Sequence, residues 1–246
     1  MIVGQGVIVG QDRAVEAFAS AWKSRRLHHA WLLAGPKGVG KASFARAAAA
    51  RVLAEAGGPP IELPGLETPP EHPMARLLAA GSHPDFRWLE RLERPTGGLA
   101  RNISVDQVRS LGNLLSVTPS MSPWRAVVID AADDLEASAA NALLKMLEEP
   151  PANTLFFLVS HAPGRLLPTI RSRCRRLDFG KLSDDAMTSL LSHSLAEANS
   201  PDVARLVEFA GGSIGRALAI AELVLAPLDG EALGVLADGE PHNRRR

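Results

Sequence analysis

A glycine-rich segment that ends in a lysine contains the residues best suited to bind phosphate. Gly35, Gly38, Gly40 and Lys41 fit the pattern G-x-x-x-x-G-K, in which backbone N–H groups converge on phosphate oxygens and the lysine adds a positive charge. The apolar run 29–34 before the loop is typical of a buried strand, and the alanine-rich stretch after it is typical of a helix, whose N-terminal end attracts anions. This context favours a phosphate-binding loop over an accidental glycine-rich turn.

An aspartate at the end of an apolar run is the second candidate site residue. Asp130 closes the run 124–130, a position from which a carboxylate can hold Mg²⁺ beside a phosphate loop. Two groups that hydrolysis needs are missing. Ala42 stands where a hydroxyl would bind Mg²⁺, and Ala131 stands where a glutamate would polarise the attacking water. Ser43 does not replace the hydroxyl, because one step along a helix turns the side chain by about 100°. We expect a nucleotide cleft with very poor turnover and no resident metal.

The elements that must position these residues alternate between strand and helix. Five strands are predicted, at 29–34, 86–89, 124–130, 154–160 and 175–179. Helices are predicted at 12–25, 41–56, 104–117 and 137–149. This alternation predicts an α/β fold with a parallel sheet and helices on both faces. Six prolines between residues 57 and 73 predict a loop. This loop is the best candidate for local mobility.

The pattern changes after Gly180, where three helices follow at about 183–197, 201–210 and 213–226 with no further strand pattern. We therefore predict three parts. Residues 1–180 form a P-loop α/β domain, residues 181–226 form a small all-helical lid domain, and residues 227–246 form a stub of a further region or a disordered tail.

Composition excludes several classes of protein. Twenty-seven basic residues balance 27 acidic ones, which argues against a chain that binds DNA mainly by neutralising phosphates, although an arginine cluster at 171–176 leaves room for a modest contact. No apolar run approaches the length of a membrane span and no secretory signal is present, so we expect a cytoplasmic protein without a membrane partner. The lone cysteine, Cys174, excludes an internal disulfide and is expected to be a small buried hydrophobe rather than a nucleophile.

One long motif carries a family resemblance. Residues 130–151 read DAADDLEASAANALLKMLEEPP, and Ser172-Arg173-Cys174 follows them. Together they resemble the clamp-loader branch of the AAA+ ATPases, over about residues 5–220. Within that branch, the two degenerate nucleotide motifs are similar to those of the stator-type subunit of the bacterial DNA polymerase III clamp loader. The resemblance implies an AAA+ P-loop domain followed by a helical lid.

The resemblance also implies roles for single residues. Arg173 matches the arginine finger, which in this family reaches the ATP held by a neighbouring motor subunit, and Ser160 matches the polar sensor 1 residue. Val9-Gly10-Gln11 resembles the adenine-side segment. From spacing alone, the alternative for Arg173 is a surface ion pair with an acid such as Asp178. The paired Glu148 and Glu149 read as a helix-end and interface feature, because neighbouring carboxylates on a helix do not face each other.

The implied partners are the other clamp-loader subunits, namely the gamma/tau motor subunits and delta, with the sliding clamp and primer-template DNA contacted through the complex. The chain would thus belong to a nucleotidyltransferase holoenzyme without being an ATPase itself. Three departures from the family stand out. The four zinc-binding cysteines that members often carry before the Asp130 strand are absent, so no zinc is expected. The sensor 2 arginine of the G-S-x-R motif falls one place late, at Arg216. Of the family's helical collar domain we expect only the stub predicted above, either because the chain stops short of that domain or because its C-terminal region diverges.

Three functions fit these residues. The first is a stator-like subunit that requires no cofactor and supplies Arg173 in trans. The second is a catalytically active P-loop ATPase of the clamp-loader or AAA+ type, which needs other groups to replace those missing at positions 42 and 131. The third is a cleft that holds ATP or ADP without efficient hydrolysis, as a structural element, for which the retained Lys41 and Asp130 argue.

Overall fold

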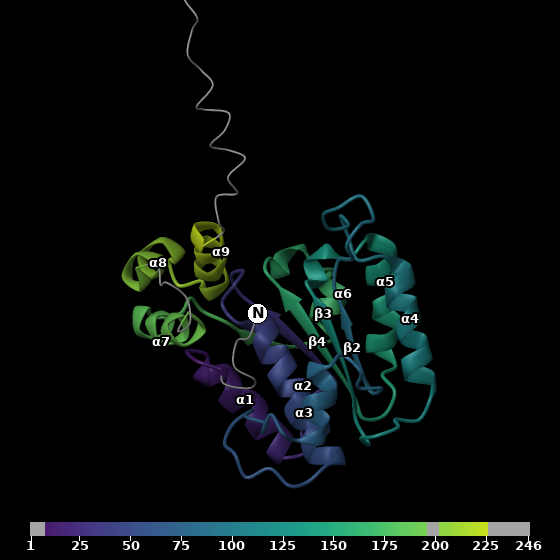
Figure 1. Ribbon diagram of the computed structural model, residues 1–246. Coiled ribbons are helices and arrows are strands. Elements are labelled where there is room, and N and C mark those ends of the chain that lie inside the picture. The colour runs from purple at the N-terminus through teal and green to yellow at the C-terminus, as the bar shows by residue number, and fades with distance from the viewer. Residues whose placement is uncertain (1–7, 196–201, 226–246) are drawn as a thin grey trace, which may run out of the picture.

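The computed structural model describes residues 8–195 and 202–225. At its centre lies a five-stranded parallel sheet with the strand order β2-β3-β4-β1-β5 (Figure 1). The strands are β1 (Ala30–Ala34), β2 (Phe86–Leu89), β3 (Arg125–Asp130), β4 (Thr154–Ser160) and β5 (Arg175–Asp178). The three central strands β3, β4 and β1 are almost entirely apolar, as expected for a parallel sheet that is covered on both faces.

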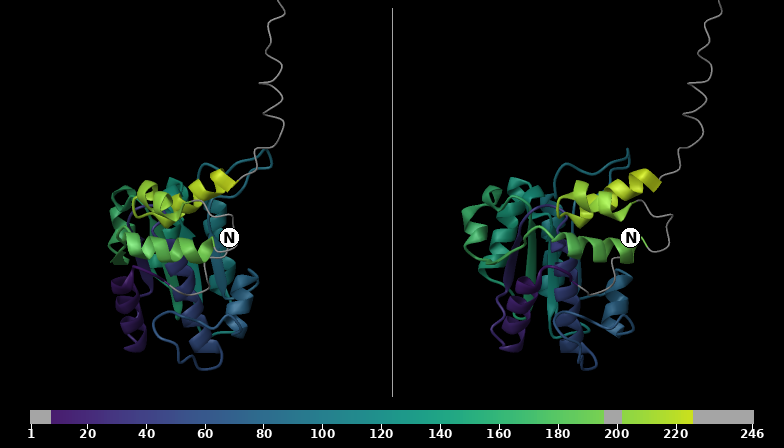
Figure 2. Two further views of the ribbon diagram at one scale, coloured as in Figure 1. Left: turned by 60° about the vertical axis from the view of Figure 1, so that its left-hand side comes forward. Right: turned by 90° about the vertical axis from the view of Figure 1, so that its left-hand side faces the viewer.

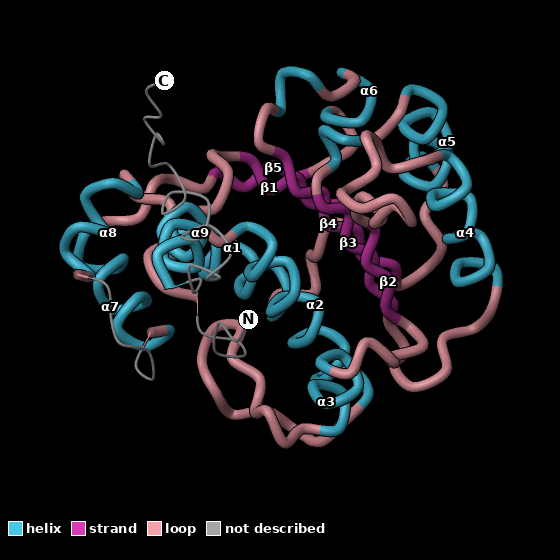
Figure 3. The backbone as a smooth tube through the Cα atoms, turned by 45° about the horizontal axis from the view of Figure 1, so that its top comes forward, coloured by secondary structure: helices cyan, strands magenta, loops and turns pink. Residues whose placement is uncertain are grey.

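Helices cover both faces of the sheet (Figure 3). One face carries α1 (Asp12–Lys23), α2 (Lys41–Gly57) and α3 (Pro73–Ala79), and the other carries α4 (Val105–Ser116), α5 (Ala137–Glu148) and α6 (Pro168–Arg171). Two short 3₁₀ turns, η1 (Ala132–Asp134) and η2 (Pro163–Arg165), follow β3 and β4. Each face has its own core, with Phe18, Trp31 and Phe44 buried on the first and Ile129 and Leu143 on the second. The predicted α/β architecture is confirmed.

Three helices follow the sheet: α7 (Asp184–Ser194), α8 (Val203–Ala210) and α9 (Ile214–Leu225). They share a separate apolar core that includes Met187, Leu191, Leu206, Ala217 and Ala221. Figure 2 shows them as one group set against the α/β domain. The chain after residue 180 is therefore helical where it is described, as predicted, and the predicted stub at 227–246 lies outside the described residues.

One helix was not expected from the sequence. Pro73 belongs to the segment predicted as a loop, yet it is the first residue of α3. Proline is well suited to that position, because its missing N–H has no partner within a helix there and its φ is already helical. The Nδ1 atom of His72 accepts a hydrogen bond from the Met74 N–H at 3.2 Å and caps this helix. The predicted capping box at the start of α4 is present between Ser104 and Gln107.

A buried arginine anchors the proline-rich segment 57–73 to α2. The guanidinium of Arg51 is almost fully buried and donates to the carbonyl oxygens of Leu63 at 2.9 Å, Glu67 at 2.6 Å and Ile61 at 3.3 Å. It also forms an ion pair of 2.5 Å with Glu55. Arg51 thus attaches this segment to α2.

Among the described residues, no cluster of three or more metal-ligating side chains occurs, and no helix is long and apolar enough to cross a membrane.

Candidate functional site

The phosphate loop connects the end of β1 to the start of α2. Gly35, Gly38 and Gly40 have φ angles of +154°, +79° and +97°, a region that side chains rarely adopt, so the loop needs glycine at these positions. No protein group in the described part of the chain accepts a hydrogen bond from the N–H groups of Gly40, Lys41 and Ala42. The first turn of α2 therefore keeps donors that can bind an anion.

Lys41 is nearly fully buried at this loop. Its ammonium donates to the carbonyl oxygen of Gly35 at 2.7 Å and to that of Pro36. Burial lowers the pKa of Lys41 from 10.5 to about 8, and the charges of Asp130 and Asp133 oppose this shift. The Lys41 ammonium therefore lies against the loop, where burial disfavours its charged form.

This pKa shift leads to a pH-dependent stability. A lysine whose pKa is lower in the folded than in the unfolded chain destabilises the fold while it is charged. The cost is complete below about pH 8 and disappears as the pH rises to 10.5. We expect the free energy of unfolding, taken relative to that of Lys41→Met, to rise by up to about 3 kcal/mol over this interval. Urea unfolding at several pH values measures it.

Lys37→Met is the matched control for this titration, because Lys37 is an exposed lysine in the same loop. Its free energy of unfolding should stay parallel to that of the unsubstituted chain over the same interval. If the free energies of unfolding of the unsubstituted chain and of Lys41→Met differed by the same amount at every pH in this interval, Lys41 would not be buried in its charged form.

Asp130 ends β3, which is separated from β1 by β4 alone. Burial raises the pKa of Asp130, with a smaller contribution from Glu90, and the charge of Lys41 opposes the rise. No ion pair within 4 Å joins Asp130 to Lys41 or to any other described cation. The structure therefore brings Lys41 and Asp130 to the same edge of the sheet without pairing them. The side chains at 42 and 131 are methyl groups, so neither a metal-binding hydroxyl nor a second carboxylate is present at these positions.

Ser160 lies at the same edge, but its hydroxyl is engaged by another residue. The carbonyl oxygen of Ser160 accepts a hydrogen bond from the Gly35 N–H at 3.3 Å, which places it at the start of the loop. Its Oγ donates to Asp133 at 2.8 Å, and the same carboxylate accepts from the backbone N–H groups of His161 and Ala162. Asp133 is the site residue that sequence reasoning missed. Its position three residues after Asp130 was visible, but the partner of Ser160 was not.

The lid packs directly on the phosphate loop. At the start of α9 the Ser213 hydroxyl donates to the Lys37 carbonyl at 3.0 Å, and the Gly215 N–H donates to the Gly38 carbonyl at 2.9 Å. A Cβ atom added to Gly215 would lie 3.0 Å from the Gly38 Cα. Position 215 is where the G-S-x-R motif would carry its arginine, and Arg216 is exposed. Glycine at 215 therefore allows a close contact in the place of a sensor 2 side chain.

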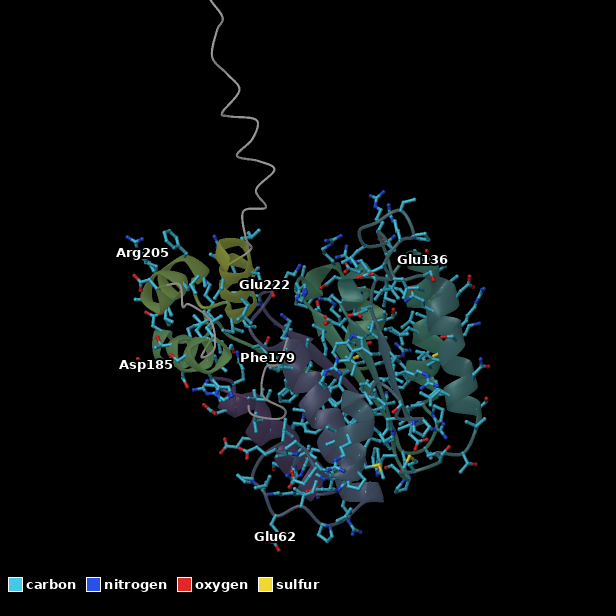
Figure 4. The ribbon with its side chains drawn as sticks, viewed as in Figure 1. Glu62, Glu136, Phe179, Asp185, Arg205 and Glu222 are labelled. Atoms are coloured by element: carbon cyan, nitrogen blue, oxygen red, sulfur yellow. The ribbon has the colours of Figure 1, made fainter. Side chains whose placement is uncertain are left out.

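The segment that connects β5 to the three lid helices is also tied to the loop. The buried side-chain amide of Gln11 donates to the Val39 carbonyl at 3.2 Å and to the Gly180 carbonyl at 2.9 Å. Phe179 packs edge-on against Phe44 of α2, and Figure 4 places it between the lid and the α/β domain. The Val9-Gly10-Gln11 segment thus lies where the loop and the lid meet.

Arg173 lies at the opposite end of the sheet. Arg175, two residues later, is aligned with Trp31 near the amino end of β1, whereas the phosphate loop begins after the carboxyl end of that strand. The guanidinium of Arg173 is about one-third exposed and forms an ion pair of 2.7 Å with Glu148 at the end of α5. It also donates to the Thr169 carbonyl at 2.9 Å. Arg173 therefore cannot serve the phosphate loop of its own chain.

The surface ion pair that spacing suggested for Arg173 is present, but its partner is Glu148 and not Asp178, which pairs with Arg176 at 2.6 Å. Arg176 and Asp178 are two residues apart and lie on the same side of β5, so Arg176 is closer to Asp178 than Arg173 is. The guanidinium of Arg175 lies 5.0 Å from the centre of the Trp31 ring. Cys174, beside the arginine, packs against the core, and burial raises the pKa of its thiol to about 12, so it is no nucleophile at neutral pH.

Comparison with known proteins relates this arrangement to a family. The family described as "DNA polymerase III, delta subunit" matches residues 10–183. The DNA polymerase III subunit delta' of Pseudomonas aeruginosa is 37% identical over 190 residues, covering 75% of this chain and 53% of that protein. The subunit delta' of Bacillus subtilis is 33% identical over 198 residues, covering 80% and 55%. The chain spans about half the length of the curated relatives it matches.

Related chains and solved structures extend the likeness. The DNA polymerase III subunit gamma of Buchnera aphidicola is 30% identical over 219 residues, covering 87% of this chain and 56% of that protein. A gamma subunit-related protein of Thermotoga maritima has a TM-score of 0.52 at 19% identity and covers 84% of this chain and 57% of its own. The RuvB motor of the same organism has a TM-score of 0.53 at 16% identity, with coverage of 93% and 64%. At these identities the two structures support the AAA+ fold alone.

Proposed function

Because the chain belongs to the family described as DNA polymerase III, delta subunit, within the AAA+ clamp loaders, we propose that it acts as the stator-like delta-prime subunit of the bacterial clamp loader. In this role it supports ATP-dependent loading of the sliding clamp onto primed DNA and supplies Arg173 to the nucleotide of a neighbouring subunit. The observation that carries the proposal is the position of Arg173, on the surface and at the end of the sheet opposite to its own phosphate loop.

The state of the chain's own cleft supports the same role. The metal-binding hydroxyl and the water-polarising carboxylate are both missing, and the lid contacts the loop with a glycine where the motif carries arginine. Each loss removes a different part of the chemistry of phosphoryl transfer. A subunit of this kind keeps the shape of an ATPase, which its neighbours can dock against, without turnover of its own.

The partners follow from this role. We propose contact with the gamma/tau motor subunits and with delta, and contact with the sliding clamp and primer-template DNA through the assembled complex, in the cytoplasm. The neutral net charge supports a chain that docks mainly to proteins rather than to DNA.

We expect the purified chain to hydrolyse ATP at the background rate in the presence of Mg²⁺, because Ala42 and Ala131 stand where the metal-binding hydroxyl and the water-polarising carboxylate would be. A phosphate-release assay measures this, with Lys41→Ala as the control. The rate should not change in the variant. Robust Mg²⁺-dependent turnover that Lys41→Ala abolishes would establish the alternative, a catalytically active P-loop ATPase, and would contradict the stator role.

A nucleotide held without hydrolysis remains compatible with the stator role. The free N–H groups at the start of α2 and the buried ammonium of Lys41 are the specific features that favour it. In that case ATP or ADP would stabilise the contact between loop and lid.

A further inference from the structure

We propose that Glu148 is a positioning residue for Arg173: its carboxylate holds the guanidinium in the orientation in which a neighbour's nucleotide meets it. This inference rests on the proposed function of Arg173 and goes beyond it. The two residues are 25 positions apart, and the fold brings them together, with Glu148 as the last residue of α5 and Arg173 two residues after α6.

The contacts leave the guanidinium oriented but available. Its Nη2 atom pairs with Glu148 Oε1 at 2.7 Å and its Nη1 atom donates to the Thr169 carbonyl at 2.9 Å. A guanidinium has five N–H donors in a fixed plane, so these two contacts orient the plane and leave further donors for phosphate oxygens. About a third of the side chain remains exposed for this purpose.

Glu148 itself is fixed by its element. Glu149 follows it and precedes Pro150 and Pro151, so α5 ends here. One residue earlier, the Leu147 carbonyl lies 3.1 Å from the Nε2 atom of His29, a residue that precedes β1. The end of α5 is thereby attached to the amino end of the sheet, and the carboxylate it presents to Arg173 has a defined place.

The strength of the ion pair favours a role in which Glu148 orients Arg173 over one in which it keeps Arg173 away from the nucleotide. A half-exposed ion pair is worth at most about 1 kcal/mol, which is too little to withhold an arginine from a polyphosphate. The same pair can still fix a long side chain with several rotatable bonds, and a small displacement of a catalytic group can lower a rate strongly. Because an arginine finger acts on charge that develops in the transition state, the expected effect is on kcat rather than on KM.

The test uses the assembled clamp loader and its DNA-stimulated ATPase. We expect Glu148→Ala to lower kcat roughly tenfold with KM for ATP unchanged. Glu148→Gln, which keeps an oxygen acceptor for Nη2, should retain activity within about threefold of the unsubstituted complex. Glu16→Ala on α1 is the control, because Glu16 is an exposed acid with no ion pair among the described residues, and it should have no effect.

A double variant separates positioning from a merely structural role. In the Arg173→Ala background, adding Glu148→Ala should cause no further loss, since the residue to be positioned is absent. A further loss in the double variant, or an unchanged or raised kcat for Glu148→Ala alone, would overturn the proposal. If Arg173→Ala alone leaves the ATPase activity intact, the proposed function of Arg173 is wrong. If Arg173→Ala lowers the activity but Glu148→Ala does not, only the positioning role of Glu148 is wrong. Thermal unfolding and complex stoichiometry, measured for each variant, exclude misfolding as the cause.

Discussion

Replacement of Arg173 by alanine is expected to lower the DNA-stimulated ATPase of the assembled clamp loader by about tenfold or more. A cation placed in trans at the transferring phosphoryl group stabilises charge in the transition state, and such arginines contribute large factors to kcat. The stability of the isolated chain should change little, because the ion pair with Glu148 is partly exposed. Steady-state ATPase assays with primed DNA and the sliding clamp measure the effect.

Arg171→Ala is the matched control for this variant. Arg171 lies two residues away at the end of α6, is exposed, and forms no ion pair within the described residues. Its removal takes one positive charge from the same surface without touching the contacts of Arg173. Equal losses in the two variants would indicate a general electrostatic effect of the arginine cluster, and full activity of the Arg173→Ala complex would contradict its role in trans.

Replacement of Arg51 by methionine is expected to have the largest effect on stability, a loss of about 3 kcal/mol or more in the free energy of unfolding. Methionine fills much of the volume, but it leaves three carbonyl oxygens without this donor. It also removes the cation beside the Glu55 carboxylate, which keeps its hydrogen bond from the Trp22 indole N–H. For a chain of this size the loss corresponds to a decrease in Tm of roughly 6–12 °C. Thermal unfolding followed by circular dichroism measures it.

Arg46→Met on the same helix is the control. Arg46 is exposed, and its guanidinium lies 4.5 Å from the centre of the Trp88 ring, a contact worth about 1 kcal/mol at most at such a site. The Tm of this variant should stay within about 3 °C of the unsubstituted chain. If the Tm of Arg51→Met also changed by no more than about 3 °C, the contacts of Arg51 with the proline-rich segment would not contribute to stability as proposed.

Most of the fold could be predicted because local patterns and the global fold agree. Continuous apolar runs mark the buried strands, and the capping box at Ser104 marks the start of α4. The short helix α3 was missed because its proline was counted with those of the preceding loop, although proline at a first helical position is a start signal. The anchoring of the proline-rich segment could not be predicted, since the carbonyl oxygens that Arg51 contacts lie 10 to 16 residues further along the chain.

The candidate site was predicted in its parts but not in its connections. Residue type and spacing located the loop glycines, Lys41 and Asp130, because motifs of this kind depend on local backbone geometry. The partners of Ser160 and Arg173 depend instead on which elements become neighbours in space. Asp133 reaches Ser160 from the turn after β3, and Glu148 reaches Arg173 from the end of α5. Spacing alone favoured a surface ion pair for Arg173 with an acid such as Asp178. The ion pair is present, but with Glu148.

Reconstitution with purified motor subunits tests the central claim most directly. The chain is mixed with gamma/tau and delta subunits, the mixture is separated by size-exclusion chromatography, and ATP hydrolysis is measured in the complex and in the chain alone. We predict that the chain elutes with the motor subunits, that the complex hydrolyses ATP in response to primed DNA and depends on Arg173, and that the chain alone stays at background. Failure to form the complex, or turnover by the chain alone at a rate that accounts for the complex, would contradict the claim.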